Sequence, residues 1–150
     1  MVDVTTEIVI DVPRVRVAEY AADPDNAPAW YQNIDFVRWE TAGPLSVGSS
    51  VAFEAAFLGR RLCYTDQVVE FRPAEKLVMR TAQGPFPMQT TYEWTEAGVN
   101  RTLMTLRNNG EPAGFSRLLA PFVGFMMKQA NRKDLARIKS ILESGSPAER

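Results

Sequence analysis

Apolar and polar residues alternate in seven stretches of the chain, which is the pattern of β-strands with one buried face. The first stretch covers residues 6–12 and places Ile8, Ile10 and Val12 on one side. Because no helix-length segment lies between the other six, they predict an antiparallel meander. Turn residues, mostly Gly, Pro and Asn, separate these six at residues 36–40, 51–57, 62–71, 77–81, 88–94 and 102–107.

Two short helices are predicted between the first strand and the meander. Pro13 opens the first, which ends near residue 23, and residues 27–32 form the second. Trp30 and Tyr31 belong to this segment, where large aromatic side chains suit the rim of a pocket. The alternative is that Trp30 anchors the short helix against the sheet, since buried indole rings serve both purposes.

A longer helix is predicted from residue 112 to 143, with Gly145 as its stop signal. Pro121 is expected to kink this helix or to divide it in two. The helix is amphipathic, and it is the only predicted element long enough to cover the apolar face of a sheet. Its mainly apolar face collects Val123, Gly124, Met127, Asn131, Asp134, Leu135, Ile138, Ile141 and Leu142.

The order of these elements predicts an α+β fold. A curved antiparallel sheet of about seven strands, with two short helices after the first strand, wraps around the long C-terminal helix. We expect residues 1–145 to form a single domain and residues 146–150 to be a disordered tail.

Composition removes several kinds of chemistry. The chain has no His and one cysteine, Cys63, which excludes Ser-His-Asp and Cys-His mechanisms, an internal disulfide and a thiolate zinc cluster. The sequence contains no phosphate loop, dinucleotide fingerprint or metal-ligand cluster, so we expect neither a cofactor nor a metal. Acid–base chemistry would have to come from carboxylates, Tyr, Lys or Arg.

Charge and hydropathy bear on partners and location. The 17 basic and 18 acidic residues give a formal net charge of −1, which does not favour nucleic-acid binding. The N-terminus lacks the pattern of a signal peptide. The longest uncharged apolar run, residues 118–127, is shorter than the roughly 20 residues that span a bilayer. We therefore expect no stable membrane insertion and, by default, a cytoplasmic location.

Several segments together resemble a known family. They are EIVIDVPRVRVAEYAADPDNAPAWYQNI, FLGRRLCYTDQVVEFRPAEKLVMRT, GPFPMQTTYEW, and LRNNGEPAGFSRLLAPF followed by ANRKDLARIKSILE. In this order they resemble the SRPBCC superfamily, with its START-like or helix-grip fold, and most of all its bacterial polyketide cyclase/dehydrase and lipid-transport branch. The resemblance covers nearly the whole chain. It implies a cavity between the curved sheet and the C-terminal helix, but no particular reaction, because one fold serves many functions.

Strand alternation assigns aromatic and methionine side chains to the inner face of the sheet. The inward sets are Val51, Phe53, Ala55 and Phe57, then Met88, Thr90, Tyr92 and Trp94, then Thr102, Met104, Leu106 and Asn108. Such surfaces suit small-molecule pockets, although the same positions often only fill a core. The predicted ligand-binding residues are Trp30, Phe53, Phe57, Tyr64, Met88, Thr90, Tyr92, Trp94, Met104, Met127 and Asn131.

The strand at residues 62–71 has two possible registers. The first places the Asp66 carboxylate in the cavity beside Tyr64, where desolvation would raise its pKa and make both residues acid–base candidates. The second leaves Asp66 facing solvent, as most Asp residues do. The inward sets are Leu62, Tyr64, Asp66 and Val68 in the first register, and Cys63, Thr65, Gln67, Val69 and Phe71 in the second.

Two polar residues interrupt the apolar face of the long helix. Asn131 and Asp134 are neighbours at i, i+3 spacing, and a buried polar group costs about 1–3 kcal/mol if it is unpaired. They are expected either to bind the polar end of a ligand, with Asp134 as a further acid–base candidate, or to pair with sheet groups such as Arg80 or Arg107.

Phe122, Phe125 and Met126 point away from the apolar face of the helix and need some other cover. The candidates are the entrance loops, a second subunit or a membrane surface, and we expect a lid or a homodimer contact.

Three functions follow. The first is binding of a hydrophobic small molecule (a lipid, a quinone or a polyketide-like compound) without chemistry. The second is a polyketide cyclase or dehydratase that uses a cavity carboxylate or tyrosine. The third is an interaction protein that uses Phe122, Phe125 and Met126 as a surface for a partner. The missing histidine favours the first.

Overall fold

The computed structural model describes residues 2–57, 59–84, 87–110 and 119–144. In this part of the chain, seven antiparallel strands form one sheet, in the spatial order β1-β7-β6-β5-β4-β3-β2. This confirms the predicted α+β helix-grip fold. The strands are β1 (Val2–Ile10), β2 (Ile34–Trp39), β3 (Ser50–Phe57), β4 (Arg60–Arg72), β5 (Lys76–Gln83), β6 (Met88–Glu96) and β7 (Thr102–Gly110). The helices are α1 (Arg14–Ala22), the 3-10 turn η1 (Pro24–Asn26), α2 (Ala27–Trp30) and α3 (Ala120–Glu143).

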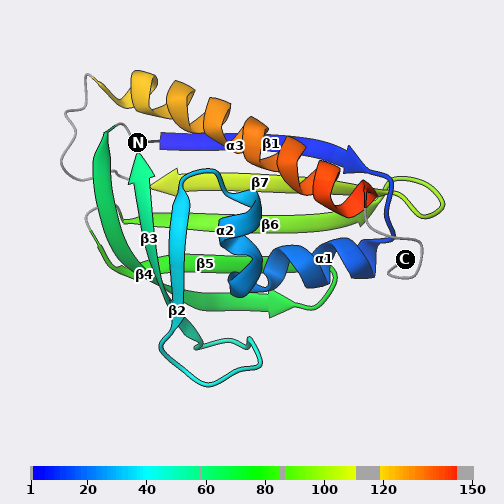
Figure 1. The fold of residues 1–150 in the computed structure, drawn as a ribbon, viewed down its shortest axis with the longest axis horizontal. Coiled ribbons are helices and arrows are strands. Elements are labelled where there is room, and N and C mark those ends of the chain that lie inside the picture. Colours follow the sequence, from blue (N-terminus) through cyan, green and yellow to red (C-terminus); the bar gives the residue numbers. More distant parts are fainter. Residues whose placement is uncertain (1, 58, 85–86, 111–118, 145–150) are drawn as a thin grey trace.

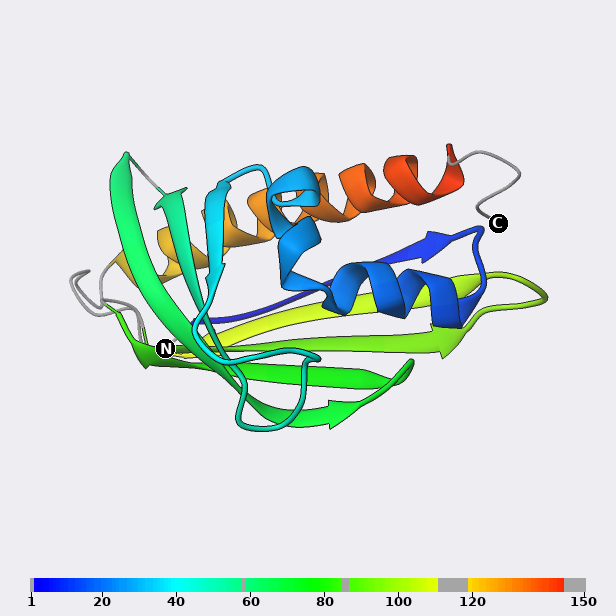
Figure 2. The same cartoon turned by 60° about the horizontal axis from the view of Figure 1, so that its bottom comes forward.

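Strands β1 and β2 follow each other in the chain but lie at opposite edges of the sheet (Figure 1). At roughly 4.8 Å per strand spacing, the chain must cross about 30 Å to connect them. The connecting segment, which contains α1, η1 and α2, makes this crossing over the concave face (Figure 2). It therefore covers part of the apolar surface that the strands present.

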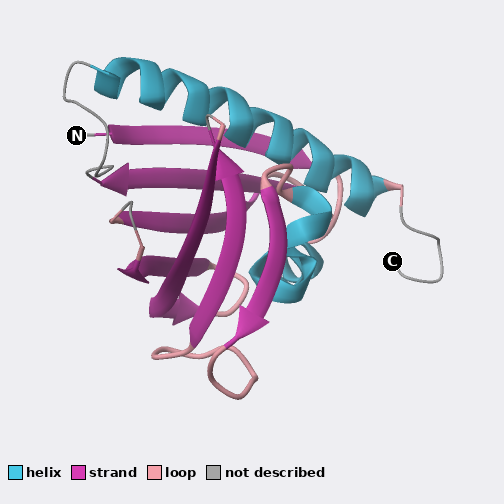
Figure 3. Ribbon diagram, turned by 60° about the vertical axis from the view of Figure 1, so that its left-hand side comes forward, coloured by secondary structure: helices cyan, strands magenta, loops and turns pink. Residues whose placement is uncertain are grey.

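Helix α3 covers the β1 side of the same face (Figures 1 and 3). Its inward residues Leu135, Ile138 and Leu142 are buried in the main core. Nearer its start, Val123 packs against Val2 and Val4 of β1 in a second, smaller cluster. The apolar face predicted from the helical wheel is thus the face that meets the sheet.

Pro121 does not kink the part of the helix that the structure describes, and whether it divides a longer helix stays a prediction. The described helix begins at Ala120 with Leu119 as its N-cap, which places Pro121 in the first turn. There the missing N–H has no helical partner to lose, and proline is well tolerated. The predicted helical residues 112–118 and the predicted tail at 146–150 lie outside the described residues.

The register of β4 follows the first of the two alternatives. Residues 62, 66 and 68 are buried, whereas Cys63 and Gln67 are exposed. The pairing with β3 accounts for this, because Tyr64 lies opposite Phe53 and Asp66 lies opposite Val51. Side chains directly opposite each other point to the same face, so the inward face of β3 fixes that of β4.

Large apolar side chains remain exposed near the start of α3. Phe122 and Phe125 are each more than half exposed, and Met126 is partly buried. A homodimer through these three residues stays a prediction. Among the described residues, no helix combines the length and the apolar character that crossing a membrane requires.

The contact between α3 and the sheet should dominate stability. Ile138 is fully buried, so we expect Ile138→Ala to lower the free energy of unfolding by about 2–5 kcal/mol, through lost burial and the cavity left behind. Urea unfolding followed by circular dichroism measures this. The control is Val15→Ala on the exposed side of α1, which should change the value by no more than about 0.5 kcal/mol. Equal effects of the two substitutions would contradict this packing.

Candidate functional site

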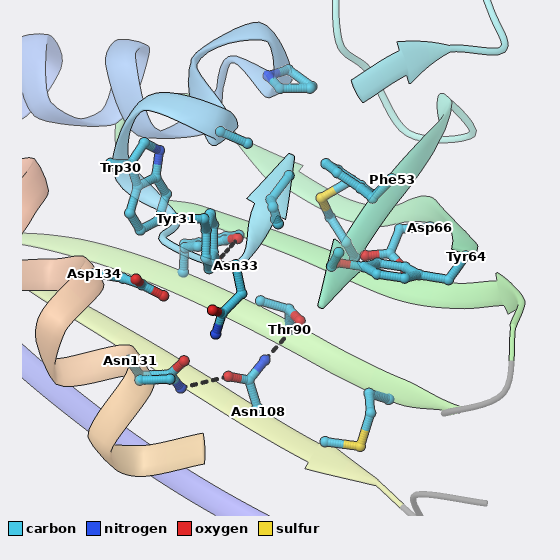
Figure 4. A pocket seen from close by; sticks show the side chains of 18 of the residues that line it. Trp30, Tyr31, Asn33, Phe53, Tyr64, Asp66, Thr90, Asn108, Asn131 and Asp134 are labelled. Carbon is cyan, nitrogen blue, oxygen red and sulfur yellow. Dashed lines mark hydrogen bonds between the residues drawn. The ribbon is translucent and has the colours of Figure 1, made fainter. Parts of the chain in front are cut away.

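A cavity lies between the sheet, the crossing segment and the first half of α3 (Figure 4). The cavity has a volume of about 180 Å³ and is partly open to solvent. Strands β3 to β7 supply its floor and one wall, and α2 and α3 supply the other walls, with further lining residues from α1, η1 and the start of β2. Most of its lining side chains are aromatic or aliphatic, as is typical of small-molecule pockets.

The structure brings most of the predicted ligand-binding residues to this cavity. Those that line it are Trp30, Phe53, Tyr64, Met88, Thr90, Tyr92, Met127 and Asn131. The acid–base candidates Asp66 and Asp134 also line it, as does Tyr31. The side chain of Phe57 lies outside the described part of the structure.

Trp94 and Met104 do not line the cavity. Both are almost fully buried in the main core, and Trp94 stacks on Tyr92 with ring centroids 6.1 Å apart. The reason is the path of α1, which passes over this end of β6 and turns the same inward face into solid core. Strand alternation alone predicts the face of the sheet on which a side chain lies, but not which element covers that face.

Asp66 is a carboxylate in an apolar site. It is 8% exposed, and within the described residues its Oδ1 atom has no hydrogen-bond partner. Burial raises the pKa of its carboxyl to about 7, although the nearby Thr81 hydroxyl offsets part of the rise. The pairing of β4 with β5 shifts register between Thr65 and Asp66, and such bulges re-aim side chains beside functional sites.

Tyr64 lies next to Asp66 on the same face of β4. Its ring stacks on Phe53 with centroids 5.4 Å apart. Gly84 packs closely against Tyr64. A Cβ atom at this glycine would lie only 2.6 Å from the Tyr64 Cβ. Burial, and then the charge of Asp66, raise the pKa of the Tyr64 hydroxyl well above its usual value, so this group remains protonated and can donate a hydrogen bond.

Three further aromatic residues form the opposite wall. The hydroxyls of Tyr31 and Tyr92 share a short hydrogen bond that joins the end of α2 to the sheet. Trp30 packs against both rings, with centroids 4.1 Å from Tyr31 and 6.2 Å from Tyr92. Burial raises the pKa of both tyrosines, which keeps this pair neutral.

A chain of amide and hydroxyl groups crosses the cavity floor (Figure 4). The Asn131 amide donates to Asn108 Oδ1 at 2.6 Å, and the Asn108 amide donates to the Thr90 hydroxyl at 2.9 Å. Asn131 on α3 is therefore paired with a sheet group, as one of its two predicted roles required.

Asp134 is paired with a backbone group and not with a side chain of the sheet, and its role in ligand binding stays a prediction. Its Oδ1 accepts a hydrogen bond of 2.9 Å from the backbone N–H of Gln32, just after α2. Burial raises the pKa of its carboxyl to about 6, and this hydrogen bond opposes the rise. The predicted pairing with arginines was wrong, because Arg80 donates to Gln89 and Arg107 donates to Asp3 on the exposed surface.

Some lining residues were missed by the sequence analysis. Leu77, Met79 and Thr81 of β5 line the cavity, and strand alternation from Leu77 would have placed all three on one face. Asn33 also lines it, but it stands in a turn between α2 and β2, where no periodic pattern indicates direction.

The arrangement supplies acid–base groups to the cavity. Among the described residues, no cluster of three or more acidic or Cys side chains is placed to hold a metal ion. A carboxyl with a pKa of about 7 can accept or release a proton near neutral pH, and a neutral tyrosine beside it can donate a hydrogen bond. The cavity can therefore bind a guest, orient it, and exchange a proton with it.

The burial of Asp66 makes stability depend on pH. The folded protein keeps its proton up to about pH 7, whereas the unfolded chain releases it near the ordinary value of 3.8, so stability falls as pH rises between these values. We expect Asp66→Asn to gain stability relative to wild type between about pH 5 and pH 8, by at least about 1 and at most about 4 kcal/mol. Urea unfolding at both pH values measures this, with the exposed Asp35→Asn as control. A constant difference across the pH range would contradict the burial of this carboxyl.

Solved structures of low sequence identity share the fold. The protein TTHA0849 from Thermus thermophilus aligns with a TM-score of 0.82 at 17% identity, over 96% of this chain and 99% of that chain. The Zhui aromatase/cyclase from Streptomyces sp. R1128 aligns at 0.77 and 15%, over 94% and 93%. A START superfamily protein from Mycobacterium smegmatis aligns at 0.74 and 10%, over 93% and 98%. At these identities the likeness shows the fold alone.

No curated protein sequence is similar enough to this chain to count as a match. A sequence model of the family described as polyketide cyclase / dehydrase and lipid transport, however, matches residues 1–143. The match spans nearly the whole chain and confirms the resemblance seen in its segments. The chain therefore belongs to the polyketide cyclase/dehydrase and lipid-transport family.

Proposed function

We propose that this protein binds a hydrophobic small molecule in the cavity between the sheet and α3. The observation that carries the proposal is a cavity lined mainly by aromatic and aliphatic side chains in the middle of the fold. Membership in a family of polyketide cyclases, dehydrases and lipid-transport proteins supports it. Burial of apolar guest surface in such a site gives about 25 cal/mol per Å².

The size of the cavity limits the part of the guest that it encloses. An apolar cavity of about 150 Å³ holds a benzene molecule. The cavity here, at about 180 Å³, accordingly suits one aromatic ring or a short branched chain. Because it is partly open, the remainder of a lipid, quinone or polyketide-like molecule would extend outward.

The walls of the cavity are held in place before any guest arrives. Phe53 and Tyr64 stack on each other, and the Tyr31–Tyr92 hydrogen bond fixes the opposite wall. The Asn131–Asn108–Thr90 chain holds α3 against the floor. A preformed site spends less binding free energy on ordering its own side chains.

Filling the cavity should prevent binding. Ala130 of α3 lines the cavity, whereas Ala136 of the same helix is exposed. We expect Ala130→Phe to weaken binding of the neutral fluorescent probe N-phenyl-1-naphthylamine at least tenfold, because the new ring occupies the guest's space. Ala136→Phe, the matched control, should bind like wild type. Fluorescence titration measures both, and equal affinities for all three proteins would refute binding in this cavity.

A second function, cyclisation with dehydration of a polyketide-like chain, is favoured by one observation. Asp66 lines the cavity beside a neutral Tyr64, and its Oδ1 atom is buried with no hydrogen-bond partner among the described residues. An ionised Asp66 could remove a proton from carbon between two carbonyls, and Tyr64 could donate a hydrogen bond to the carbonyl oxygen. The carbanion would attack a second carbonyl carbon, the resulting alkoxide would take up the proton, and loss of water would complete the ring.

Substitution of Asp66 distinguishes the enzymatic function from ligand binding alone. If the protein is an enzyme, Asp66→Asn should lower kcat for a poly-β-carbonyl thioester at least a hundredfold, while KM changes little. Product formation followed by mass spectrometry measures this, with Asp35→Asn as control. If wild type produces no more cyclised product than buffer does, the enzymatic function is excluded and ligand binding remains.

A further inference from the structure

The charges around the cavity all have one sign. Its charged lining residues are Asp23, Asp66 and Asp134, and neither Lys nor Arg occurs among the described residues that line it. Asp23 stands at the exposed turn after α1, where its side chain accepts from the Asp25 backbone N–H. The other two are buried, so their environment determines which guest is tolerated.

Four cations on α3 and the sheet bind groups outside the cavity lining. Arg137 on α3 donates to the Ala29 carbonyl at 2.5 Å, and Lys139 donates to the Val9 carbonyl and to Glu143. Arg80 and Arg107 are exposed and bind groups on the outer surface. A carboxylate guest would thus find no cation among the described residues that line the cavity.

A guest cannot avoid the carboxylates by turning round. Asp66 comes from β4 and Asp134 from α3, and Figure 4 shows them on opposite sides of the cavity. The charges of both act on Tyr92, which also lines the cavity. Either orientation of an elongated anion would bring its charge towards a buried carboxyl, and unpaired like charges in a site of low polarity are strongly disfavoured.

A guest that donates a hydrogen bond should bind favourably, in contrast to an anion. Asp66 Oδ1 is a buried acceptor without a donor in the described structure, and an unmet acceptor costs about 1–3 kcal/mol. A guest hydroxyl would supply the missing hydrogen bond. The stacked rings of Phe53 and Tyr64 beside it offer a flat apolar surface for an aromatic ring.

We propose that the cavity selects uncharged aromatic molecules that donate a hydroxyl hydrogen bond to Asp66, and that it rejects aromatic and fatty carboxylates. This inference rests on the proposed ligand-binding function and names its ligand class. A phenol-like or enol-like guest satisfies both the rings and the carboxyl, whereas a carboxylate satisfies only the rings.

The rejection should weaken as the carboxyls become protonated. Asp66 is faced by the neutral groups Tyr64, Tyr92 and Thr81, and Asp134 by Tyr31, Tyr92 and the Gln32 N–H. No described cation takes part, so lowering the pH through the range where both carboxyls gain protons removes the repulsion directly. A bound carboxylate then accepts a hydrogen bond from the protonated acid.

The test compares two probes of equal ring size, 2-naphthol and 2-naphthoate, by fluorescence or calorimetric titration. For wild type at about pH 8 we expect 2-naphthol to bind at least tenfold more tightly. Between about pH 8 and pH 5.5, where 2-naphthoate stays ionised and 2-naphthol stays neutral, the affinity for 2-naphthoate should rise at least fivefold and that for 2-naphthol should not rise. This comparison needs no substitution, so it holds even if a variant fails to fold.

The variant Asp66→Asn keeps the shape of the side chain and removes the charge. It should bind 2-naphthoate at about pH 8 at least fivefold more tightly than wild type, whereas Asp35→Asn, which removes one charge from the exposed surface, should not. Equal or tighter binding of 2-naphthoate by wild type would overturn the selectivity, while binding of N-phenyl-1-naphthylamine would still support the proposed function. Failure of all three probes to bind would overturn both.

Discussion

A curved sheet with one apolar face must be covered, and here two separate elements share the cover. The segment between β1 and β2 crosses the concave face because these consecutive strands lie at opposite edges, and α3 covers the β1 side. The two covers are joined by the hydrogen bond from the Gln32 N–H to Asp134 and by that from Arg137 to the Ala29 carbonyl. Where β3 and β4 curve away from both, the cover is incomplete and the cavity remains.

This incomplete cover explains the chemistry of the site. Side chains that would be core residues in a filled fold instead border free space, and polar groups among them lose water without gaining full sets of partners. Asn131 and Asp134 find partners on the sheet and on the α2 turn, whereas Asp66 Oδ1 finds none among the described residues. Leaving an acceptor unpaired lowers stability, and such costs are concentrated at functional sites.

Much of this fold could be predicted from sequence because its signals are local. Period-two alternation and turn residues located the strands, and helical spacing identified the apolar face of α3. The register of β4 could not be predicted, since both of its faces carry apolar residues and the choice is made by pairing with Phe53 and Val51 of β3. The core positions of Trp94 and Met104, and the Asn108 partner of Asn131, depend on which distant element lies above or opposite. The alternation of apolar and polar residues along a strand does not indicate which distant element will lie there.

The most direct test of the central claim is to locate a bound guest by amide chemical shifts in a two-dimensional NMR titration with N-phenyl-1-naphthylamine. The account predicts that the largest shift changes occur at residues that border the cavity from separate elements, such as Ala55, Asp66, Thr90 and Asn131. Shift changes confined to the exposed surface around Phe122 and Phe125, with none at those residues, would contradict it.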